Sequence, residues 1–141
     1  MKRAGKQLVY GYQPELALSG ADAPLPPIET WPNQHRGYEI HIEHPEFTSV
    51  CPKTKLPDFG TLELSYEPAR LCLELKSFKY YLLGYRNMGI FYENAVNHIL
   101  QDIVRAAKPV WAELAGSFTT RGGMRSVIVA RYGTRRIPRR H

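Results

Sequence analysis

The chain of 141 residues is long enough for one domain with a substantial core and too short for two large ones. Its hydrophobic content of 43% and charged content of 23% are typical of a soluble globular protein. No apolar run reaches the length that spans a bilayer, and the first residues lack the hydrophobic stretch of a secretory signal. We therefore expect a cytoplasmic protein without a membrane partner.

Cysteine and histidine usage argues against a metal centre. Cys51 and Cys72 do not form a CxxC pair, and two cysteines are too few for a disulfide framework. His41 and His44 are three residues apart in an extended segment, where such positions face opposite sides. The sequence therefore predicts no structural zinc and no other metal.

The net charge of +6 does not identify a partner by itself. Residues 132–141 form a short basic tail with Pro138 and no apolar periodicity, which is more typical of a solvated end than of a reader of nucleic-acid sequence. Basic side chains elsewhere could equally bind a phosphorylated small molecule.

Residues 1–37 are rich in proline and glycine and show no sustained periodicity, so we expect an irregular arm with a short helical turn near Glu15–Leu18. Regular structure is predicted from there on. Tyr38–Glu43 alternates large apolar and polar residues, which indicates a strand with one buried face.

The segment Phe47–Phe59 follows, and Pro52 and Pro57 predict a stiff, extended or turning loop there. Cys51 and Asp58 on this loop are candidates for a nucleophile and its proton-transfer partner. The structural alternative is a small buried cysteine and an aspartate that forms a turn.

The remaining pattern predicts strands, two helices and two strands. The alternations of Thr61–Tyr66 and Arg70–Lys76 indicate strands, and in the second we expect the leucines to face one way and Cys72, Glu74 and Lys76 the other. The later predicted elements are a short helix after Ser77 that ends before Gly89, a long helix over Phe91–Ala107, and strands over Val110–Thr119 and Met124–Arg131 around the turn 120–123. This is an α+β layout of ββααββ-like order, with an antiparallel sheet that carries both helices on one face. The single domain covers residues 38–131.

Three polar groups lie outside the cysteine loop. Lys76, Ser77 and Lys79 stand at a predicted helix start, where free N–H groups favour phosphate, although a capping serine with solvated lysines explains them as well. Glu93, beside Tyr92, suits the helix macrodipole, and its carboxylate could also accept two N–H bonds from a guanine-like base. The third group, Arg121-Gly122-Gly123, is either a phosphate-binding turn or a simple hairpin.

These pieces together resemble a known enzyme family, the short, single-module NADPH-dependent 7-cyano-7-deazaguanine reductases, the nitrile reductases of queuosine biosynthesis. The resemblance runs in order from about Tyr38 to Ala130. Its most specific part is Glu74-Leu-Lys-Ser-Phe-Lys-Tyr-Tyr81, the signature that separates these reductases from their relatives. The other matching motifs are Pro45–Thr54, Pro57–Phe59, Tyr85–Asn87, Phe91–Glu93 and Phe118–Gly123.

The resemblance implies the tunnelling fold, in which small strand–helix units assemble into an oligomeric barrel with active sites between subunits. It also implies a decamer of two stacked pentamers, a small-molecule substrate and no direct contact with nucleic acid.

The resemblance further implies residue roles. Cys51 would attack the nitrile to form a covalent thioimide, and Asp58 would act as proton donor. Leu73, Glu74, Leu75, Tyr92 and Glu93 would bind the substrate. Lys76, Ser77, Lys79, Arg121 and Gly122 would bind NADPH.

Four positions depart from the family pattern. Lys55 stands where the family commonly has glycine, and Tyr92 where histidine often precedes the glutamate. His44 replaces a frequent cysteine and Thr120 a frequent proline. None of them removes the proposed nucleophile, proton donor or base-binding carboxylate.

Other functions remain open from the sequence. A relative on the same fold adds an amino group to the nitrile on tRNA and needs no NADPH, but the intact Glu74–Tyr81 block argues against it. A zinc-dependent GTP cyclohydrolase of this fold lacks its ligand set here. A basic RNA-binding module without catalysis would bind RNA in a salt-sensitive way that survives loss of Cys51.

Overall fold

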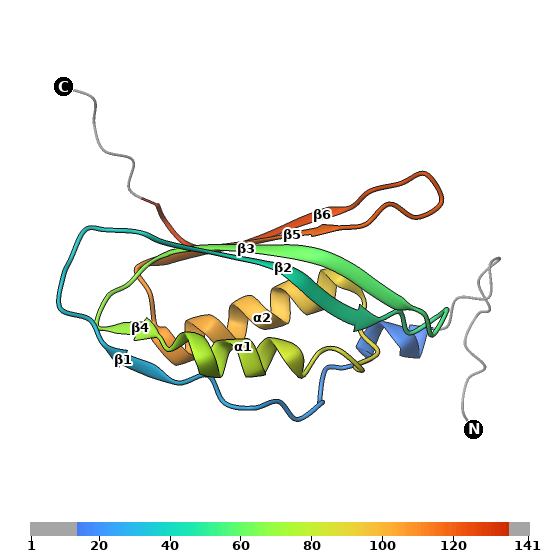
Figure 1. Ribbon diagram of the computed structural model, residues 1–141, viewed down its shortest axis with the longest axis horizontal. Helices are drawn as coiled ribbons and strands as arrows, with labels where there is room; N and C mark the ends of the chain where they lie inside the picture. Colours follow the sequence, from blue (N-terminus) through green and yellow to red (C-terminus); the bar gives the residue numbers. More distant parts are fainter. Residues whose placement is uncertain (1–13, 136–141) are drawn as a thin grey trace.

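A four-stranded antiparallel sheet carries two α-helices on one face in the computed structural model, which describes residues 14–135 (Figure 1). The strands lie in the order β2-β3-β5-β6, and a separate pair, β1-β4, lies beside the start of α1. The α+β class, the ββααββ order and the placement of both helices are confirmed. The elements are η1 (Pro14–Leu18), β1 (Thr30–Pro32), β2 (Ile40–Val50), β3 (Pro57–Glu67), β4 (Leu71–Leu73), α1 (Leu75–Leu83), α2 (Tyr92–Ala107), β5 (Trp111–Phe118) and β6 (Val127–Gly133).

The core lies between the sheet and the helices. Along β3 the side chains of Leu62, Leu64 and Tyr66 are buried because alternate positions of a strand face the same side. Helix α2 contributes a buried stripe at three- and four-residue steps, and it approaches β5 closely: a Cβ on Gly116 would lie 2.7 Å from a methyl of Val96. Glycine at this position therefore lets the helix pack against the strand.

The loop that contains Cys51 is shorter than the predicted loop Phe47–Phe59. Strand β2 begins at Ile40 and continues to Val50, with a bulge between His44 and Phe47, and β3 begins at Pro57. Only residues 51–56 turn. Pro57 is tolerated as the first residue of its strand, where no ladder hydrogen bond from its nitrogen is needed.

The predicted strand Arg70–Lys76 is wrong in its second half. The strand ends at Leu73, and α1 begins at Leu75 because the Glu74 carboxylate caps the helix by accepting bonds from the backbone nitrogens of Lys76 at 3.0 Å and Ser77 at 2.7 Å. The expected division into an apolar and a polar side therefore fails. Cys72 and Leu73 are both buried, whereas Leu75 is 59% exposed.

The first segment contains an element that the sequence did not predict. The short helical turn near Glu15–Leu18 is confirmed as η1, but Thr30–Pro32 also forms β1, which pairs with β4. In the predicted basic tail, residues 132 and 133 belong to β6, and residues 136–141 lie outside the described part of the chain. No helix within residues 14–135 is long and apolar enough to cross a membrane.

Candidate active site

Cys51 lies at the tip of the β2–β3 hairpin, in a turn closed by two backbone hydrogen bonds. The Cys51 nitrogen donates to the Leu56 carbonyl, and the Lys55 nitrogen donates to the Cys51 carbonyl, both at 2.9 Å. Lys55 adopts a left-handed φ of 61° to complete this turn. Glycine adopts that conformation without strain, which gives a physical reason for the glycine common at this position in the family.

This turn activates the Cys51 thiol. Partial burial raises its pKa, but hydrogen bonds from the Thr54 hydroxyl and from the backbone N–H groups of Thr54 and Lys53 outweigh that effect, so the pKa lies below the usual value of a thiol. The negative charge of Asp58 acts in the opposite direction, which places the carboxylate within electrostatic range of the sulfur. A partly buried but accessible thiol with a lowered pKa is typical of a reactive cysteine.

Asp58 is buried at the start of β3 and holds two partners on a single oxygen. Its Oδ1 accepts a hydrogen bond from the Tyr92 hydroxyl at 2.9 Å and lies 2.9 Å from Nη2 of Arg121. Arg121 also donates to the Pro57 carbonyl. Among residues 14–135, no hydrogen bond or ion pair engages the other oxygen, Oδ2, so that oxygen is available for proton transfer.

Tyr92 joins α2 to this carboxylate. Its ring stacks on Phe118 at 3.9 Å between centroids, and burial together with the bond to Asp58 raises its pKa to about 12. The hydroxyl therefore stays protonated, and so a donor, throughout the neutral range. The neighbouring Glu93 is exposed in the first turn of α2, where the macrodipole favours its negative charge.

The second cysteine lacks these features. Cys72 is fully buried in β4, and its sulfur contacts the Tyr38 hydroxyl at 3.5 Å. It is a packing residue of the β1–β4 pair. The structure thus distinguishes the two thiols.

The predicted substrate and cofactor residues on α1 lie at the other end of the sheet. Cys51, Asp58 and Tyr92 are at the β2–β3 tip, whereas Leu73 to Ser77 follow the far end of β3 (Figure 1). Nine strand residues separate the two ends, or about 30 Å. One copy of the chain therefore brings together only half of the predicted site: Cys51, Asp58, Tyr92 and Arg121, with Glu93 and Gly122 at the same end.

In the far half, three predicted residues already have structural partners. The Glu74 carboxylate caps α1, and the bonds from Ser77 and Lys76 lower its pKa. The Ser77 hydroxyl donates to the Glu74 carbonyl at 2.9 Å and accepts from the Glu29 nitrogen at 2.8 Å. Leu73 is buried in the core, whereas Lys76, Lys79 and Leu75 are exposed.

Gly122 lies at the tip of the β5–β6 hairpin with a φ of 56°. Nothing in the described chain lies within 4 Å of where its Cβ would be. The backbone conformation, rather than crowding by a neighbour, therefore requires glycine here.

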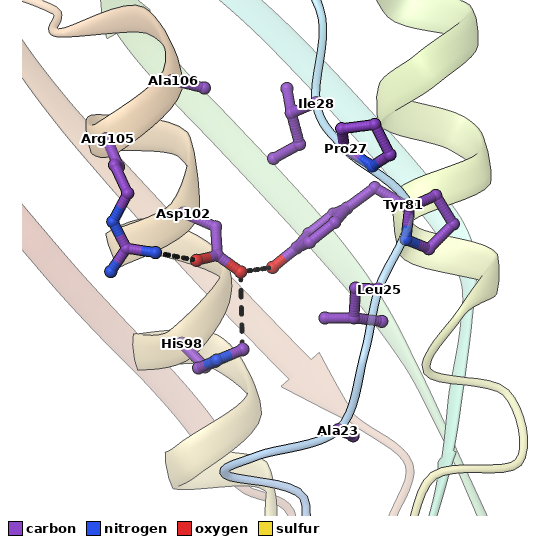
Figure 2. Close-up of a pocket in the computed structure, with 10 residues that line it drawn as sticks. Ala23, Leu25, Pro27, Ile28, Tyr81, His98, Asp102, Arg105 and Ala106 are labelled. Atoms are coloured by element: carbon purple, nitrogen blue, oxygen red, sulfur yellow. Dashed lines mark hydrogen bonds and ion pairs between the residues drawn. The ribbon is translucent and has the colours of Figure 1, made fainter.

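A separate pocket of about 390 Å³ lies between α1, α2 and the segment 23–28 (Figure 2). Asp102 is its central group, and it accepts from the Tyr81 hydroxyl at 2.5 Å, lies 3.6 Å from His98 and pairs with Arg105 at 3.2 Å. The carboxylate, tyrosine and imidazole groups of this pocket thus contact one another. They form a polar network that joins the two helices, which is not the arrangement of a reaction centre.

Two residues of the site were not assigned from the sequence. Thr54 stands three positions after Cys51, a spacing at which a hydroxyl can reach back across a turn, so the signal was present. Phe118 had no local signal, because its contact with Tyr92 depends on how α2 packs on β5.

Comparisons with known proteins identify a family and similar chains. The family described as "QueF-like protein" matches residues 57–137. A protein named NADPH-dependent 7-cyano-7-deazaguanine reductase from Elusimicrobium minutum is 62% identical over 87% of this chain and 94% of its own length. The protein of the same name from Chloroherpeton thalassium is 54% identical over 74% of this chain and 92% of its own length.

A comparison with solved structures also shows the fold. The archaeosine synthase QueF-Like in its apo form superposes with a TM-score of 0.64, covering 71% of this chain and 96% of its own, at 23% identity. Such a likeness shows the fold alone. Because the family model matches more than half of the chain and relatives are up to 62% identical, the chain belongs to the QueF-like family.

Proposed function

We propose that this chain is an NADPH-dependent reductase that converts the nitrile of 7-cyano-7-deazaguanine to the primary amine, 7-aminomethyl-7-deazaguanine. The observation that carries the proposal is the Cys51–Asp58 pair: a thiol of lowered pKa within electrostatic range of a buried carboxylate, one oxygen of which has no partner among residues 14–135. The names of relatives up to 62% identical point to the same activity.

In the proposed first step, Cys51 adds through sulfur to the nitrile carbon. The S–H proton passes by way of Asp58 to the nitrile nitrogen, so that the product is a neutral thioimide held on the enzyme. Tyr92 and Arg121 hold Oδ1 of Asp58 in place, and Oδ2 exchanges the proton. The carboxylate ends the step in its original state.

Bound NADPH supplies the hydride, once for the thioimide and once for the imine that remains after the sulfur leaves. Each reduction also adds a proton to nitrogen, so two NADPH and two protons are used per nitrile. Asp58 would deliver these protons, and Cys51 would regain its thiol when the adduct collapses.

The residues present fit a phosphate-bearing dinucleotide. Lys76 and Lys79 are exposed, and neither forms an ion pair with another residue between 14 and 135. Ser77 would act indirectly, because its hydroxyl is occupied in fixing the start of α1 to Glu29. Arg121 and Gly122 would approach the cofactor from the β5–β6 hairpin.

The substrate site would lie between two copies of the chain. Tyr92 and Glu93 would bind the guanine-like edge from one subunit, and the segment Leu73–Leu75 from its neighbour, because these groups lie at opposite ends of one sheet. β2 and β6 are the outer strands of the four-stranded sheet, and they could continue it into a barrel. We propose a decamer of two pentamers, a cytoplasmic location and a catalytic domain over residues 38–131.

The test follows NADPH absorbance after addition of 7-cyano-7-deazaguanine. We expect two NADPH consumed per nitrile by the wild-type chain and none by Cys51→Ala, with Cys72→Ala as the matched control that removes the buried thiol and keeps turnover. A covalent nitrile adduct without NADPH consumption would reject the reductase in favour of addition chemistry. Unchanged turnover in Cys51→Ala would reject the nucleophile.

A further inference from the structure

The hydroxyl of Ser49 is an anomaly in the core. Ser49 is fully buried in β2, and its Oγ is the one buried side-chain oxygen or nitrogen in the described part of the chain that has no hydrogen-bond partner. A buried hydroxyl that forms no hydrogen bond is unfavourable, and alanine would fit the same space without that cost. Packing in the ligand-free state therefore does not explain why this residue is a serine.

The position of Ser49 supplies that reason. In the β2–β3 hairpin, Ser49 is the direct cross-strand partner of Asp58, one pair inward from Val50 and Pro57. Directly paired residues of an antiparallel sheet face the same side, with Cβ atoms about 5 Å apart. The unpaired hydroxyl therefore projects beside the buried carboxylate, two residues before the Cys51 thiol.

The other groups that contact this carboxylate leave its second oxygen without a partner. Tyr92 donates to Oδ1 and the Arg121 guanidinium, which can only donate, pairs with the same oxygen, so neither of them serves Oδ2. The proposed reaction puts the exchanged proton on Oδ2, and no residue between 14 and 135 holds that oxygen in place. A serine hydroxyl can rotate toward a neighbouring carboxylate oxygen and donate to it.

We propose that Ser49 is a positioning residue for Asp58. Its hydroxyl turns to Oδ2 during the reaction and donates to it, which keeps the carboxyl plane aimed at Cys51 and leaves the proton that Oδ2 takes up free to pass to the nitrile nitrogen. The hydrogen bond forms in the reacting state and not in the ligand-free one, so it lowers the barrier without tightening substrate binding. This inference rests on the proposed function and deepens the role of the same site.

The test compares Ser49→Ala with wild type in three measurements. These are kcat and KM with the nitrile and NADPH, the rate of covalent adduct formation at Cys51 without NADPH, and the Tm. We expect kcat and the adduct rate to fall on the order of tenfold. We also expect KM to stay within about twofold and the Tm to stay equal or rise, because an unpaired hydroxyl is removed. The matched control is Ser65→Ala on β3, whose hydroxyl bonds His41 instead, and it should keep the wild-type rates.

A second variant, Ser49→Thr, retains the hydroxyl. When its Tm shows that it folds, we expect it to recover most of the adduct rate. Wild-type rates in Ser49→Ala, a fall in Tm with a matching rise in KM, or a folded Ser49→Thr as slow as Ser49→Ala would each overturn the inference. Absence of turnover in the wild-type chain would instead reject the proposed function, so the two failures are distinct.

Discussion

Arg121 lies 2.9 Å from Oδ1 of Asp58, and this contact joins the tip of the β5–β6 hairpin to the buried carboxylate at the start of β3. The sequence assigned Arg121 to NADPH, yet in the ligand-free chain its guanidinium serves Asp58. The two assignments make different kinetic predictions, because adduct formation at Cys51 needs Asp58 but not NADPH.

For Arg121→Ala we expect adduct formation without NADPH to slow on the order of tenfold, because a charge-assisted hydrogen bond to a buried carboxylate is lost. Rapid mixing with the nitrile and detection of the covalent adduct by mass spectrometry measure this rate. Arg125→Ala, which removes an exposed arginine of the same hairpin, is the control. A normal adduct rate with only a raised KM for NADPH would assign Arg121 to the cofactor alone.

Tyr92→Phe separates two contributions of one side chain. The stacking on Phe118 is kept, so the stability should change little, whereas the hydrogen bond to Asp58 is lost. We expect kcat to fall about five- to tenfold with a Tm close to that of the wild type. Tyr80→Phe on α1, at an exposed tyrosine, is the matched control. A kcat equal to the wild type would show that Asp58 needs no support from α2.

The pH dependence of Cys51 reactivity should depend on Thr54. The thiol pKa is lowered by hydrogen bonds from Thr54, so the thiolate is present at lower pH than in an ordinary cysteine. Thr54→Val removes the hydroxyl donor, which raises the pKa, moves the alkylation profile to higher pH and slows alkylation at neutral pH. To measure the shift, Cys51 is labelled with iodoacetamide at pH values from about 6 to about 10, and the labelled peptide is quantified by mass spectrometry. Thr61→Val in β3 is the control, and a downward shift in Thr54→Val would contradict the prediction.

The sequence predicted the elements whose signal is local. Alternation identified β3 correctly because its side chains face a core on one side and leave the other open. The same alternation misled at Arg70–Lys76, because Glu74 is not a preferred capping residue and yet caps α1. Nothing local connects Tyr92 with Asp58, which are 34 residues apart, so that contact required the packed structure.

The division of the site also had no sequence signal, and it leads to the last prediction. Since Cys51 and the start of α1 lie at opposite ends of β3 in one copy, the site proposed above takes residues from two subunits. A Cys51→Ala chain and a Lys76→Ala/Lys79→Ala chain should each be nearly inactive alone. When the two chains are unfolded or dissociated together and then reassembled, we expect mixed assemblies. About a quarter of their interfaces should combine an intact Cys51 end with an intact Lys76–Lys79 end.

We therefore expect the mixture to recover about a quarter of wild-type NADPH consumption, whereas the two proteins mixed without exchange of subunits recover none. Native mass spectrometry of the same samples shows whether mixed assemblies have formed. The control pairs Cys51→Ala with Asp58→Asn, which lie at the same end of the chain: no interface then has an intact Cys51 end, so the pair should not recover. Recovery in the control pair would mean that Cys51 and Asp58 act from different subunits. No recovery in the test pair despite mixed assemblies would mean that a single subunit supplies both halves of its own site.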